Sequence, residues 1–342
     1  MPSEERFRGA SAPVLPECDG GRCVHARSPL ASCRACVDAC PRGAWLLGEE
    51  GLGLDTEACD GCGLCLPACP EEALSLPRGL AVRAVAGGDH AYGACERAGV
   101  TADEAVMPCL HALGLRDLAR LHANSVRTIV VTDVACDDCP RGVGRRLDDA
   151  VGEFRALAED RGSEPILVRR LDRDTWHRDL SGNDRPGGLP HLERRELFTA
   201  FLRPRSKQAA TPAPAPAPVE ESPLSLYVPA IDGARCTACE ACVRICRHRA
   251  LLMDGTSGVG WSYRIIAGNC TGCGLCVDIC DEAAITVERL ARPRRTELRL
   301  VARRCTKCGA PFAEPQERDT GERTCRICRR VDHNRNLFQV LE

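Results

Sequence analysis

Between residues 80 and 171, short apolar runs alternate with amphipathic stretches. The runs LAVRAVAG (80–87), EAVMPC (104–109), RTIVVTDVAC (127–136) and PILVRRL (165–171) have the length and composition of β-strands. Two intervening segments, GLRDLARLHAN and GRRLDDAVGEFRALAEDR, have apolar residues at helical spacing. Alternating strands and helices predict a small α/β domain with a parallel sheet, and we assign residues 80–203 to it.

A second, shorter pattern occurs once before and once after this domain. The segments AWLLGEEGLGLD (44–55) and ALLMDGTSGVGWSYRII (250–266) alternate apolar and polar positions around glycines. Such alternation predicts β-hairpins. We therefore expect two further modules, at residues 1–79 and 230–291, in a chain of α+β class.

A proline-rich segment separates the two halves of the chain. Residues 207–229 read KQAATPAPAPAPVEESPLSLYVP. Alternating alanine and proline favours an extended polyproline conformation of about 3.1 Å per residue. We expect residues 204–229 to be a spacer between separately folded halves.

Composition changes this picture mainly through the cysteines. Only 4% of the 342 residues are aromatic, 25 are cysteines, and the net charge of −2 indicates no particular partner. The N-terminus has no apolar signal segment, and no run of about 18 apolar residues occurs. We expect a cytoplasmic protein without a transmembrane segment, although peripheral association with a membrane complex is compatible with this. In a reducing compartment, grouped thiols indicate metal binding rather than disulfides.

Most cysteines fall into runs with the spacing C-x2-C-x2-C-x3-C. Three runs are complete: Cys59, Cys62, Cys65 and Cys69; Cys236, Cys239, Cys242 and Cys246; Cys270, Cys273, Cys276 and Cys280. The remaining run, Cys33, Cys36 and Cys40, has Leu30 in place of its first cysteine. Its missing ligand must come from upstream, and we expect Cys23, with Cys18 as the alternative.

These runs resemble those of bacterial two-cluster ferredoxins over residues 18–78 and 228–290. The resemblance implies βαβ-type modules that transfer single electrons at low potential between proteins. It also implies that the fourth cysteine of each run binds the other cluster of its module. The ligands of four 4Fe-4S clusters would then be Cys23, Cys33, Cys36 and Cys69 (cluster 1), Cys40, Cys59, Cys62 and Cys65 (cluster 2), Cys236, Cys239, Cys242 and Cys280 (cluster 3), and Cys246, Cys270, Cys273 and Cys276 (cluster 4).

The second module departs from this family at two positions. Arg247 and Asp281 stand where a proline usually follows the fourth cysteine. We expect altered hydrogen bonding around its clusters and shifted potentials. Zinc on the same cysteines is the alternative, but zinc sites rarely take ligands that cross between two such runs.

Residues 292–342 contain a different cysteine spacing. Cys305 and Cys308, then Cys325 and Cys328, form two C-x2-C pairs with 16 residues between them. Such pairs predict a zinc ribbon with one zinc ion, or a rubredoxin-like domain with iron on the same ligands. The basic run ARPRRTELRLVARR (291–304) lacks an aromatic platform for nucleic acid. We expect a solvated face or a docking patch for an acidic redox partner, and no nucleic acid.

Four further cysteines belong to the α/β domain. Cys109 follows the second expected strand, Cys136 and Cys139 follow the third, and Cys95 lies in a glycine-containing loop. The carboxyl ends of parallel strands meet at one rim, where these thiols could hold another iron-sulfur cluster or zinc. A redox dithiol at Cys136 and Cys139, with Cys95 and Cys109 as inert buried residues, is the alternative.

This domain resembles the small iron-sulfur subunit that links hydrogenases to heterodisulfide reductases, and also thioredoxin-like 2Fe-2S ferredoxins. The resemblance rests on one cysteine after a strand and a two-cysteine loop after a later strand. Nearby Asp133, Asp137 and Asp138 would raise a thiol pKa, which disfavours an activated nucleophile. Histidines near the cysteines, including His111, lack the paired spacing of zinc ligands, and we expect surface or capping roles for them.

The combined pattern predicts a polyferredoxin-like electron carrier with a protein donor and a protein acceptor. It would be a subunit or accessory of a larger oxidoreductase. The sequence contains no Walker loop, nucleophile elbow or acid/base pair, so we assign no catalytic residue. One alternative is an oxidoreductase subunit whose central cysteine domain acts on a disulfide or small substrate. Another is a cluster-dependent sensor or assembly factor.

Overall fold

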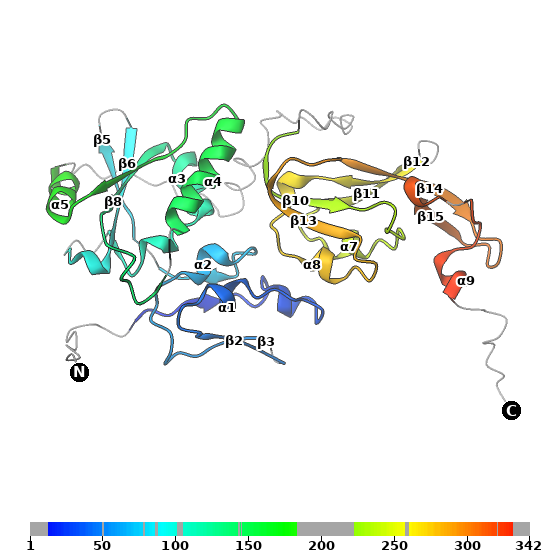
Figure 1. The fold of residues 1–342 in the computed structure, drawn as a ribbon, viewed down its shortest axis with the longest axis horizontal. Helices are drawn as coiled ribbons and strands as arrows, with labels where there is room; N and C mark the ends of the chain where they lie inside the picture. The colour runs from blue at the N-terminus through cyan, green and yellow to red at the C-terminus, as the bar shows by residue number, and fades with distance from the viewer. Residues whose placement is uncertain are drawn as a thin grey trace. The chain divides into compact units, whose positions relative to one another are not determined.

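The computed structural model describes residues 13–330, except residues 50, 78, 86–87, 101–104, 143, 145, 183–221, 257–259 and 320. The described residues form a mixed α+β structure. The chain divides into two compact units, Met1–Ser206 (unit 1) and Lys207–Glu342 (unit 2), and Figure 1 shows their elements.

The first part of unit 1 is built from short elements, and we name it the first cysteine module. Its elements are β1 (Glu17–Cys18), the 3-10 helix η1 (Val24–Ala26), α1 (Ala35–Ala39), β2 (Trp45–Gly48), β3 (Gly51–Leu54), α2 (Cys65–Ala68) and β4 (Leu74–Ser75). Strands β2 and β3 form the hairpin expected for residues 44–55, and β1 pairs antiparallel with β4. Trp45 is buried with Leu66 and Leu74, so the hairpin packs against α2.

The rest of unit 1 is a five-stranded sheet with helices on both faces. Its elements are β5 (Ala81–Val85), β6 (Gly88–Cys95), η2 (Glu96–Ala98), β7 (Val106–Met107), η3 (Leu110–Ala112), α3 (Leu115–Ala123), β8 (Val126–Thr132), α4 (Arg146–Asp160), β9 (Leu167–Leu171) and α5 (Arg173–Gly182). The strand order is β5-β6-β8-β9, with β7 beside β6. All pairs are parallel except β5 with β6. The expected parallel sheet is therefore present, with one antiparallel edge strand.

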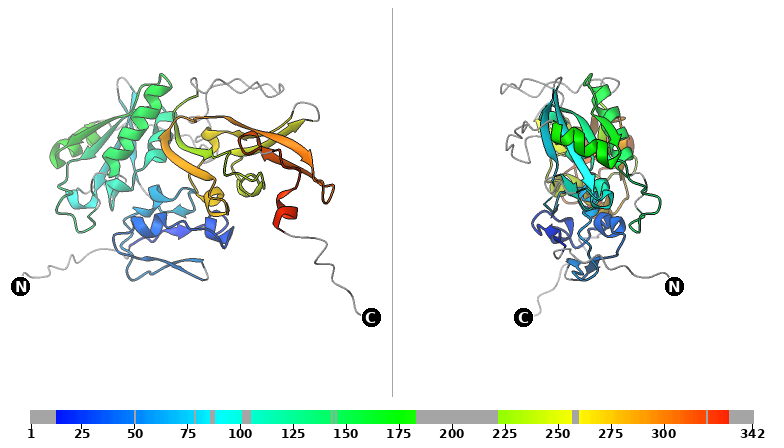
Figure 2. Two further views of the ribbon diagram at one scale, coloured as in Figure 1. Left: turned by 45° about the vertical axis from the view of Figure 1, so that its right-hand side comes forward. Right: turned by 90° about the vertical axis from the view of Figure 1, so that its left-hand side faces the viewer.

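Two apolar cores lie on opposite faces of this central sheet. Because successive side chains of a strand alternate between faces, Ile129 of β8 contributes to one core and Val130 to the other. Helices α3 and α4 cover the first of these faces (Figure 2), and Phe154 of α4 is buried in its core. Helix α5 covers the second, where the Trp176 Nε1–H donates to the Val130 carbonyl at 3.1 Å. The sheet thus holds its carboxyl rim on a rigid two-sided scaffold.

The sequence pattern does not predict strand β6, which pairs with three other strands. Its sequence, GDHAYGAC, contains two glycines and no β-branched residue, so its intrinsic strand preference is low. Pairing with its neighbours overrides that preference, and Ala91, Tyr92 and Ala94 are fully buried. Cys95 is the last residue of this strand, so our expectation that Cys95 lies in a loop is wrong.

Unit 2 contains two sheets. Its elements are β10 (Ser225–Ile231), α7 (Ala241–Ile245), β11 (Leu251–Thr256), β12 (Gly260–Ile265), η5 (Ala267–Asn269), α8 (Leu275–Asp278), β13 (Ile285–Ala291), β14 (Glu297–Arg304), β15 (Pro311–Pro315), η6 (Gln316–Arg318) and α9 (Arg326–Arg330). Strand β10 pairs antiparallel with β13, and β11, β12, β14 and β15 form an antiparallel sheet in that order. Leu251, Tyr263 and Leu298 share one core beneath the second sheet.

Two segment boundaries in unit 2 differ from those expected from the sequence. Strand β10 begins at Ser225, so the end of the expected spacer 204–229 is a strand of the second module. Residues 204–221 of that spacer lie outside the described residues. In the C-terminal segment, β14 pairs with β12 over four residue pairs. The C-terminal strands therefore continue the sheet of the second module's hairpin.

Candidate metal centres

Four cysteines that the sequence assigns to one centre surround one cavity in the first cysteine module. Cys23, Cys33, Cys36 and Cys69, which we name site 1, line a space of about 370 Å³. Burial raises the pKa of the Cys36 thiol to about 12, and the thiols of Cys69 and Cys33 contribute. Cys18 is exposed and is not among the described residues that line this space. Cys23 lines this space and Cys18 does not, although Cys18 lies close enough to Cys23 and Cys69 for their thiols to raise its pKa.

The second set in this module lies against the central sheet. Site 2 comprises Cys40, Cys59, Cys62 and Cys65. Burial raises the pKa of the Cys65 thiol to about 11, and the thiols of Cys40 and Cys59 add to the increase. Burial also raises the pKa of Cys62 to about 12. Cys62 forms a small buried cluster with Leu64 and with Cys109 of the central domain.

In unit 2 the structure brings together both crossed sets. They are Cys236, Cys239, Cys242 and Cys280 (site 3), and Cys246, Cys270, Cys273 and Cys276 (site 4). Burial raises the pKa of Cys242 to about 12, with contributions from the other three thiols of site 3. Burial raises the pKa of Cys276 as well, and the other three thiols of site 4 contribute. Each set therefore includes the fourth cysteine of the opposite run, as crossed ligation requires.

The same type of turn follows the last cysteine of every run. The alanine four residues later donates its N–H to the cysteine Sγ at 3.3 Å: Ala44 to Cys40, Ala73 to Cys69, Ala250 to Cys246 and Ala284 to Cys280. The residue before that alanine has a left-handed backbone and donates its N–H to the cysteine carbonyl: Gly43, Glu72, Arg249 and Ala283. Only one of these four residues is glycine. An N–H bond to sulfur favours the thiolate that a metal requires.

The replacement of proline in the second module does not alter this bond. Arg247 and Asp281 lie directly after the fourth cysteine, whereas the donor to sulfur is the residue four positions on. The N to Sγ distance is 3.3 Å in both modules. The expectation of altered hydrogen bonding is therefore wrong for this bond, and the shift in potential stays a prediction.

In the three complete runs, the residues on both sides of the second cysteine have a left-handed backbone. Gly272 and Gly274 have φ values of 78° and 81°. A Cβ on Gly272 would lie 2.6 Å from the Tyr227 ring, so glycine is required there for space as well as for backbone angle. The equivalent residues Ala238 and Glu240 adopt the same backbone region at some cost in strain.

The four sets fit a metal group with positive charge. Thiols with raised pKa values stay protonated at neutral pH unless a cation stabilises the thiolate. Site 1 also offers space between its thiols, and Val24, Leu52 and Leu74 line it with apolar surface that limits access by water. Dense thiols, space and apolar walls together suit a cluster better than isolated reactive cysteines.

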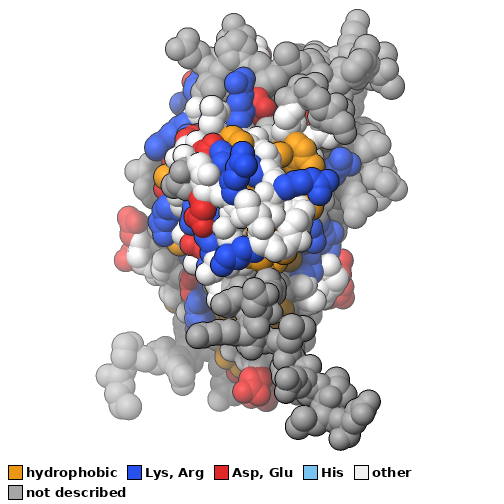
Figure 3. Space-filling model, turned by 90° about the vertical axis from the view of Figure 1, so that its right-hand side faces the viewer, with side chains coloured by type: hydrophobic (Ala, Val, Ile, Leu, Met, Phe, Trp, Pro, Cys, Tyr) orange, Lys and Arg blue, Asp and Glu red, His pale blue; other side chains and the backbone are white. Residues whose placement is uncertain are grey.

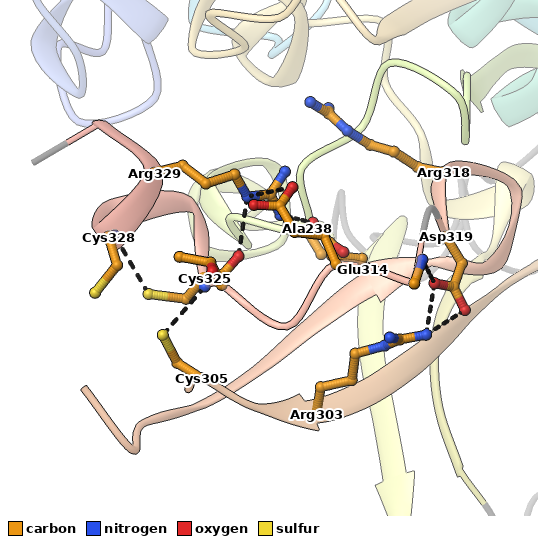
Figure 4. Close-up of polar contacts among 12 residues, drawn as sticks. Ala238, Arg303, Cys305, Glu314, Arg318, Asp319, Cys325, Cys328 and Arg329 are labelled. Atoms are coloured by element: carbon orange, nitrogen blue, oxygen red, sulfur yellow. Dashed lines mark hydrogen bonds and ion pairs between the residues drawn. The ribbon is translucent and has the colours of Figure 1, made fainter. Parts of the chain in front are cut away.

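The C-terminal cysteines form a smaller and tighter set. The sulfur atoms of Cys305, Cys308, Cys325 and Cys328 all lie within 4.8 Å of one another. The Cys325 N–H donates to the Cys305 Sγ at 3.3 Å, and the Cys328 N–H donates to the Cys325 Sγ at 3.5 Å (Figure 4). The Cys325 N–H makes the largest contribution to lowering the pKa of Cys305 to about 6, and the N–H groups of Cys308 and Lys307 add to it. This compact set fits a single four-coordinate ion.

Ion pairs hold this set against the strands. Arg329 of α9 pairs with Glu314 of β15 and, at 3.5 Å, with Glu322. Arg303 of β14 pairs with Asp319 at 2.5 Å (Figure 4). Helix α9 and the loop before it are thus fastened to β14 and β15.

The basic run at residues 291–304 is largely engaged with the chain itself. Arg294 pairs with Glu288 at 2.9 Å, and Arg295 pairs with Glu317 at 2.5 Å. Figure 3 shows basic and acidic side chains interspersed on one face of the molecule. Local pairing of this kind fits the expected solvated face better than a phosphate-binding surface.

The central sheet brings its four cysteines to one cavity. Cys95, Cys109, Cys136 and Cys139 line a space of about 460 Å³, which we name the rim site. Cys95 ends β6, Cys109 follows β7, and the other two follow β8, so all four lie beyond the carboxyl ends of parallel strands. Burial raises the pKa of Cys109 to about 11.

The Cys136 thiol of the rim is not activated. Burial raises the pKa of Cys136, and the thiols of Cys95 and Cys139 and the carboxylate of Asp137 raise it further. A nucleophilic cysteine requires the opposite shift. The rim therefore fits metal binding better than dithiol chemistry.

Two residues at the rim were missed by the sequence. His111 is 6% exposed, so the expected surface role is wrong, whereas the capping role is confirmed by its bond to the first turn of α4. Its Nδ1 accepts from the Leu147 N–H at 3.0 Å, and its Nε2 lies 3.4 Å from the Cys136 Sγ. Arg141 also lines the cavity. His111 lies two positions after Cys109, and Arg141 lies two positions after Cys139. This closeness in sequence is a weak indication that both residues belong to the rim.

Parts of the chain match known families. Residues 269–314 match a family described as a 4Fe-4S dicluster domain, and residues 53–75 match a 4Fe-4S binding domain. Residues 21–43 and 234–253 both match a further family described as a 4Fe-4S binding domain. No curated protein matches the chain.

The matched ranges contain all four cysteine runs. The range 269–314 also includes Cys305 and Cys308 but ends before Cys325, and the rim cysteines lie outside every match.

Among the described residues, no helix has the length and apolar character needed to cross a membrane. Ferredoxin-type domains transfer electrons to and from protein redox partners. The chain is therefore a multi-cluster iron-sulfur protein with ferredoxin-type 4Fe-4S domains and an electron-transfer role.

Proposed function

We propose that the protein is a polyferredoxin-like carrier that moves single electrons between protein partners as a subunit or accessory of a larger oxidoreductase. The observation that carries this proposal is the crossed grouping of buried thiols in both units. Cys242 has Cys280 as a neighbour, and Cys276 has Cys246, although each partner belongs to the other run. Crossed sets place two clusters close together, which suits rapid exchange of electrons between them.

The proposed ligands follow these groups. Sites 1 to 4 would each hold a 4Fe-4S cluster on the four cysteines named above for that site. The C-terminal set would hold zinc, with mononuclear iron as the alternative on the same sulfurs. Its short sulfur separations leave space for one ion only.

We further propose a fifth iron-sulfur centre at the rim site. Four thiols converge on one cavity there, and the buried cluster of Cys62, Leu64 and Cys109 connects site 2 to the rim. This contact supports a continuous relay through unit 1. Zinc on the rim cysteines is the alternative.

The chain's own residues would hold and tune these centres. The alanine N–H groups donate to the fourth cysteine of each run, and the Trp45 side chain donates to Cys65. Such bonds stabilise thiolate charge and raise reduction potentials. When bound, the clusters supply reversible one-electron chemistry.

A second candidate function is supported by the rim cavity itself. Two half-buried thiols, Cys136 and Cys139, border this cavity, where a disulfide or a small substrate could approach them from solvent. The raised pKa of Cys136 counts against this function. Spectral oxidation of the reduced protein by a disulfide, without a partner protein, would favour it.

Metal and sulfide analysis of anaerobically purified protein tests the main proposal. We expect about 16 iron and 16 sulfide per chain from four cubanes, about two to four more of each from the rim, and about one zinc. EPR of the reduced protein should show interacting clusters. Zinc in excess with no acid-labile sulfide in intact protein would contradict the electron-carrier function.

A further inference from the structure

The rim cavity is bordered by positive charge. Arg97, Arg141 and Arg170 are among its lining residues, and no carboxylate is among the described residues that line it. The carboxylates that pair with these arginines, Asp60, Glu96 and Asp148, lie outside that lining. The guanidinium groups therefore border the cavity directly, although Glu96, the residue after Cys95, raises the pKa of the Cys95 thiol more than Arg141 lowers it.

Arg141 is the most firmly held of these cations. Its side chain is 10% exposed, and its Nε donates to Asp60 at 2.9 Å. Its two terminal nitrogens donate to Glu96 at 2.8 Å and to the Pro108 carbonyl at 2.5 Å. Asp60 belongs to the loop of site 2, so the guanidinium is fixed between site 2 and the rim. A cation that three acceptors hold acts as a permanent charge.

His111 adds a directed hydrogen bond. Because its Nδ1 accepts from the Leu147 N–H, the proton of the neutral ring is on Nε2, which faces the Cys136 Sγ at 3.4 Å. A hydrogen bond to a ligand sulfur stabilises the more negative, reduced state of a centre. Both residues therefore favour an added electron at the rim.

Site 1 has the opposite electrostatic environment. Glu71, which is 5% exposed, lines its cavity, and no arginine or lysine is among the described lining residues. Arg27, which lies outside that lining, forms an ion pair with Glu71 at 3.8 Å. A carboxylate so close to a centre disfavours added negative charge. An electron is therefore held less tightly at site 1 than at the rim.

We propose that unit 1 conducts electrons in one direction, from site 1 through site 2 to the rim, and that Arg141 and His111 are positioning residues that make the rim the higher-potential end. The inference rests on the proposed iron-sulfur centres. In each step one electron leaves a reduced centre, which is oxidised, and reduces the next. A protein donor supplies the first electron, and a protein acceptor at the rim takes the last. The buried contact of Cys62, Leu64 and Cys109 connects the last two centres.

An EPR-monitored redox titration of the full-length, iron-loaded protein tests this direction. The EPR signal of the rim centre is identified as the one that disappears in the Cys139→Ser variant. We expect its midpoint potential to lie above that of site 1. Arg141→Met and His111→Leu should each shift the rim equilibrium at least tenfold toward the oxidised form, which is about 59 mV for one electron, without changing site 1.

Two matched variants separate charge from structure. Arg141→Lys keeps the cation and should restore most of the lost potential. Arg42→Gln removes a different cation that lies 3.5 Å from Asp60 but does not line the rim, and it should leave the rim potential unchanged. If the Arg141→Met variant fails to assemble the rim centre, the His111→Leu and Arg141→Lys variants still show how these side chains change the midpoint potential of that centre.

Three outcomes would overturn the inference. A rim potential at or below that of site 1 rejects the direction but leaves the fifth centre intact. Unchanged potentials in both Arg141→Met and His111→Leu reject the assigned roles. An iron content limited to four cubanes, with no signal lost in Cys139→Ser, rejects the fifth centre as well, while the electron-carrier function of sites 1 to 4 remains.

Discussion

The backbone N–H of Ala284 lies 3.3 Å from the sulfur of Cys280, four residues earlier in the chain. Ala283 makes this possible because its left-handed backbone, with φ of 45°, turns the chain back toward the cysteine. The same turn follows Cys40, Cys69 and Cys246. Each turn presents the fourth cysteine of one run to the thiols of the other run.

The first prediction concerns the strain in this turn. Ala283→Gly should stabilise unit 2 by about 1 kcal/mol, because glycine adopts a left-handed backbone without the Cβ clash. The measurement is the thermal midpoint of the iron-loaded protein, which should rise by a few degrees. Ala241→Gly, within the short helix α7, is the control and should lower the midpoint. A fall for both variants would show that Ala283 is not strained.

The second prediction concerns the crossed ligands. Cys280→Ser should alter the centre at site 3, whereas Cys276→Ser, from the same run, should alter the centre at site 4. The reason is that Cys280 neighbours Cys242 while Cys276 neighbours Cys246. EPR and Mössbauer spectra of the two variants should therefore differ in which centre changes. Loss of the same centre in both would mean that each run binds its own cluster.

The third prediction concerns the packing of the first cysteine module on the central domain. A Cβ on Gly114, just before α3, would lie 2.4 Å from the Pro67 side chain of α2. Gly114→Ala should destabilise unit 1 by about 1 to 3 kcal/mol through overpacking. Gly152→Ala is the control, since Gly152 lies in α4 with nothing within 4 Å of an added Cβ.

Thermal unfolding of the iron-loaded protein separates these two glycine variants. Gly152→Ala should raise the midpoint, because alanine has the higher helix propensity by about 1 kcal/mol. Gly114→Ala should lower the midpoint and weaken the magnetic interaction between site 2 and the rim. Equal midpoint shifts for both variants would argue against tight packing at Pro67.

The fourth prediction concerns removal of the C-terminal metal. Cys325→Ala combined with Cys328→Ala should remove the C-terminal metal ion, which we propose to be zinc, and leave the iron and sulfide content unchanged. Because β14 pairs with β12, that strand should remain protected from hydrogen exchange, while β15 and α9 lose protection. Loss of iron in this variant would instead mean that the second module needs the C-terminal metal to fold.

Local features could be predicted from the sequence with good detail. The hairpins at β2–β3 and β11–β12 lie within the expected segments, because period-two alternation and glycine turns act over a few residues. The helical patterns that predict α3 and α4 likewise depend on short-range spacing. Strand β6 escaped prediction since its pairing partners, and not its own residues, stabilise it.

By itself the sequence determined the ferredoxin-type cysteine loops and the iron-sulfur class of the protein, because three thiols within seven residues are held together by local backbone geometry. Only the tertiary structure decided which distant residues join them. Cys23, and not Cys18, lines the cavity of site 1, and the C-terminal strands join the sheet of the second module. The tertiary structure also gathered the rim from segments as far apart as Cys95 and Cys139 and added His111 and Arg141. Such neighbours depend on which strands pair side by side, and no short-range spacing records that choice.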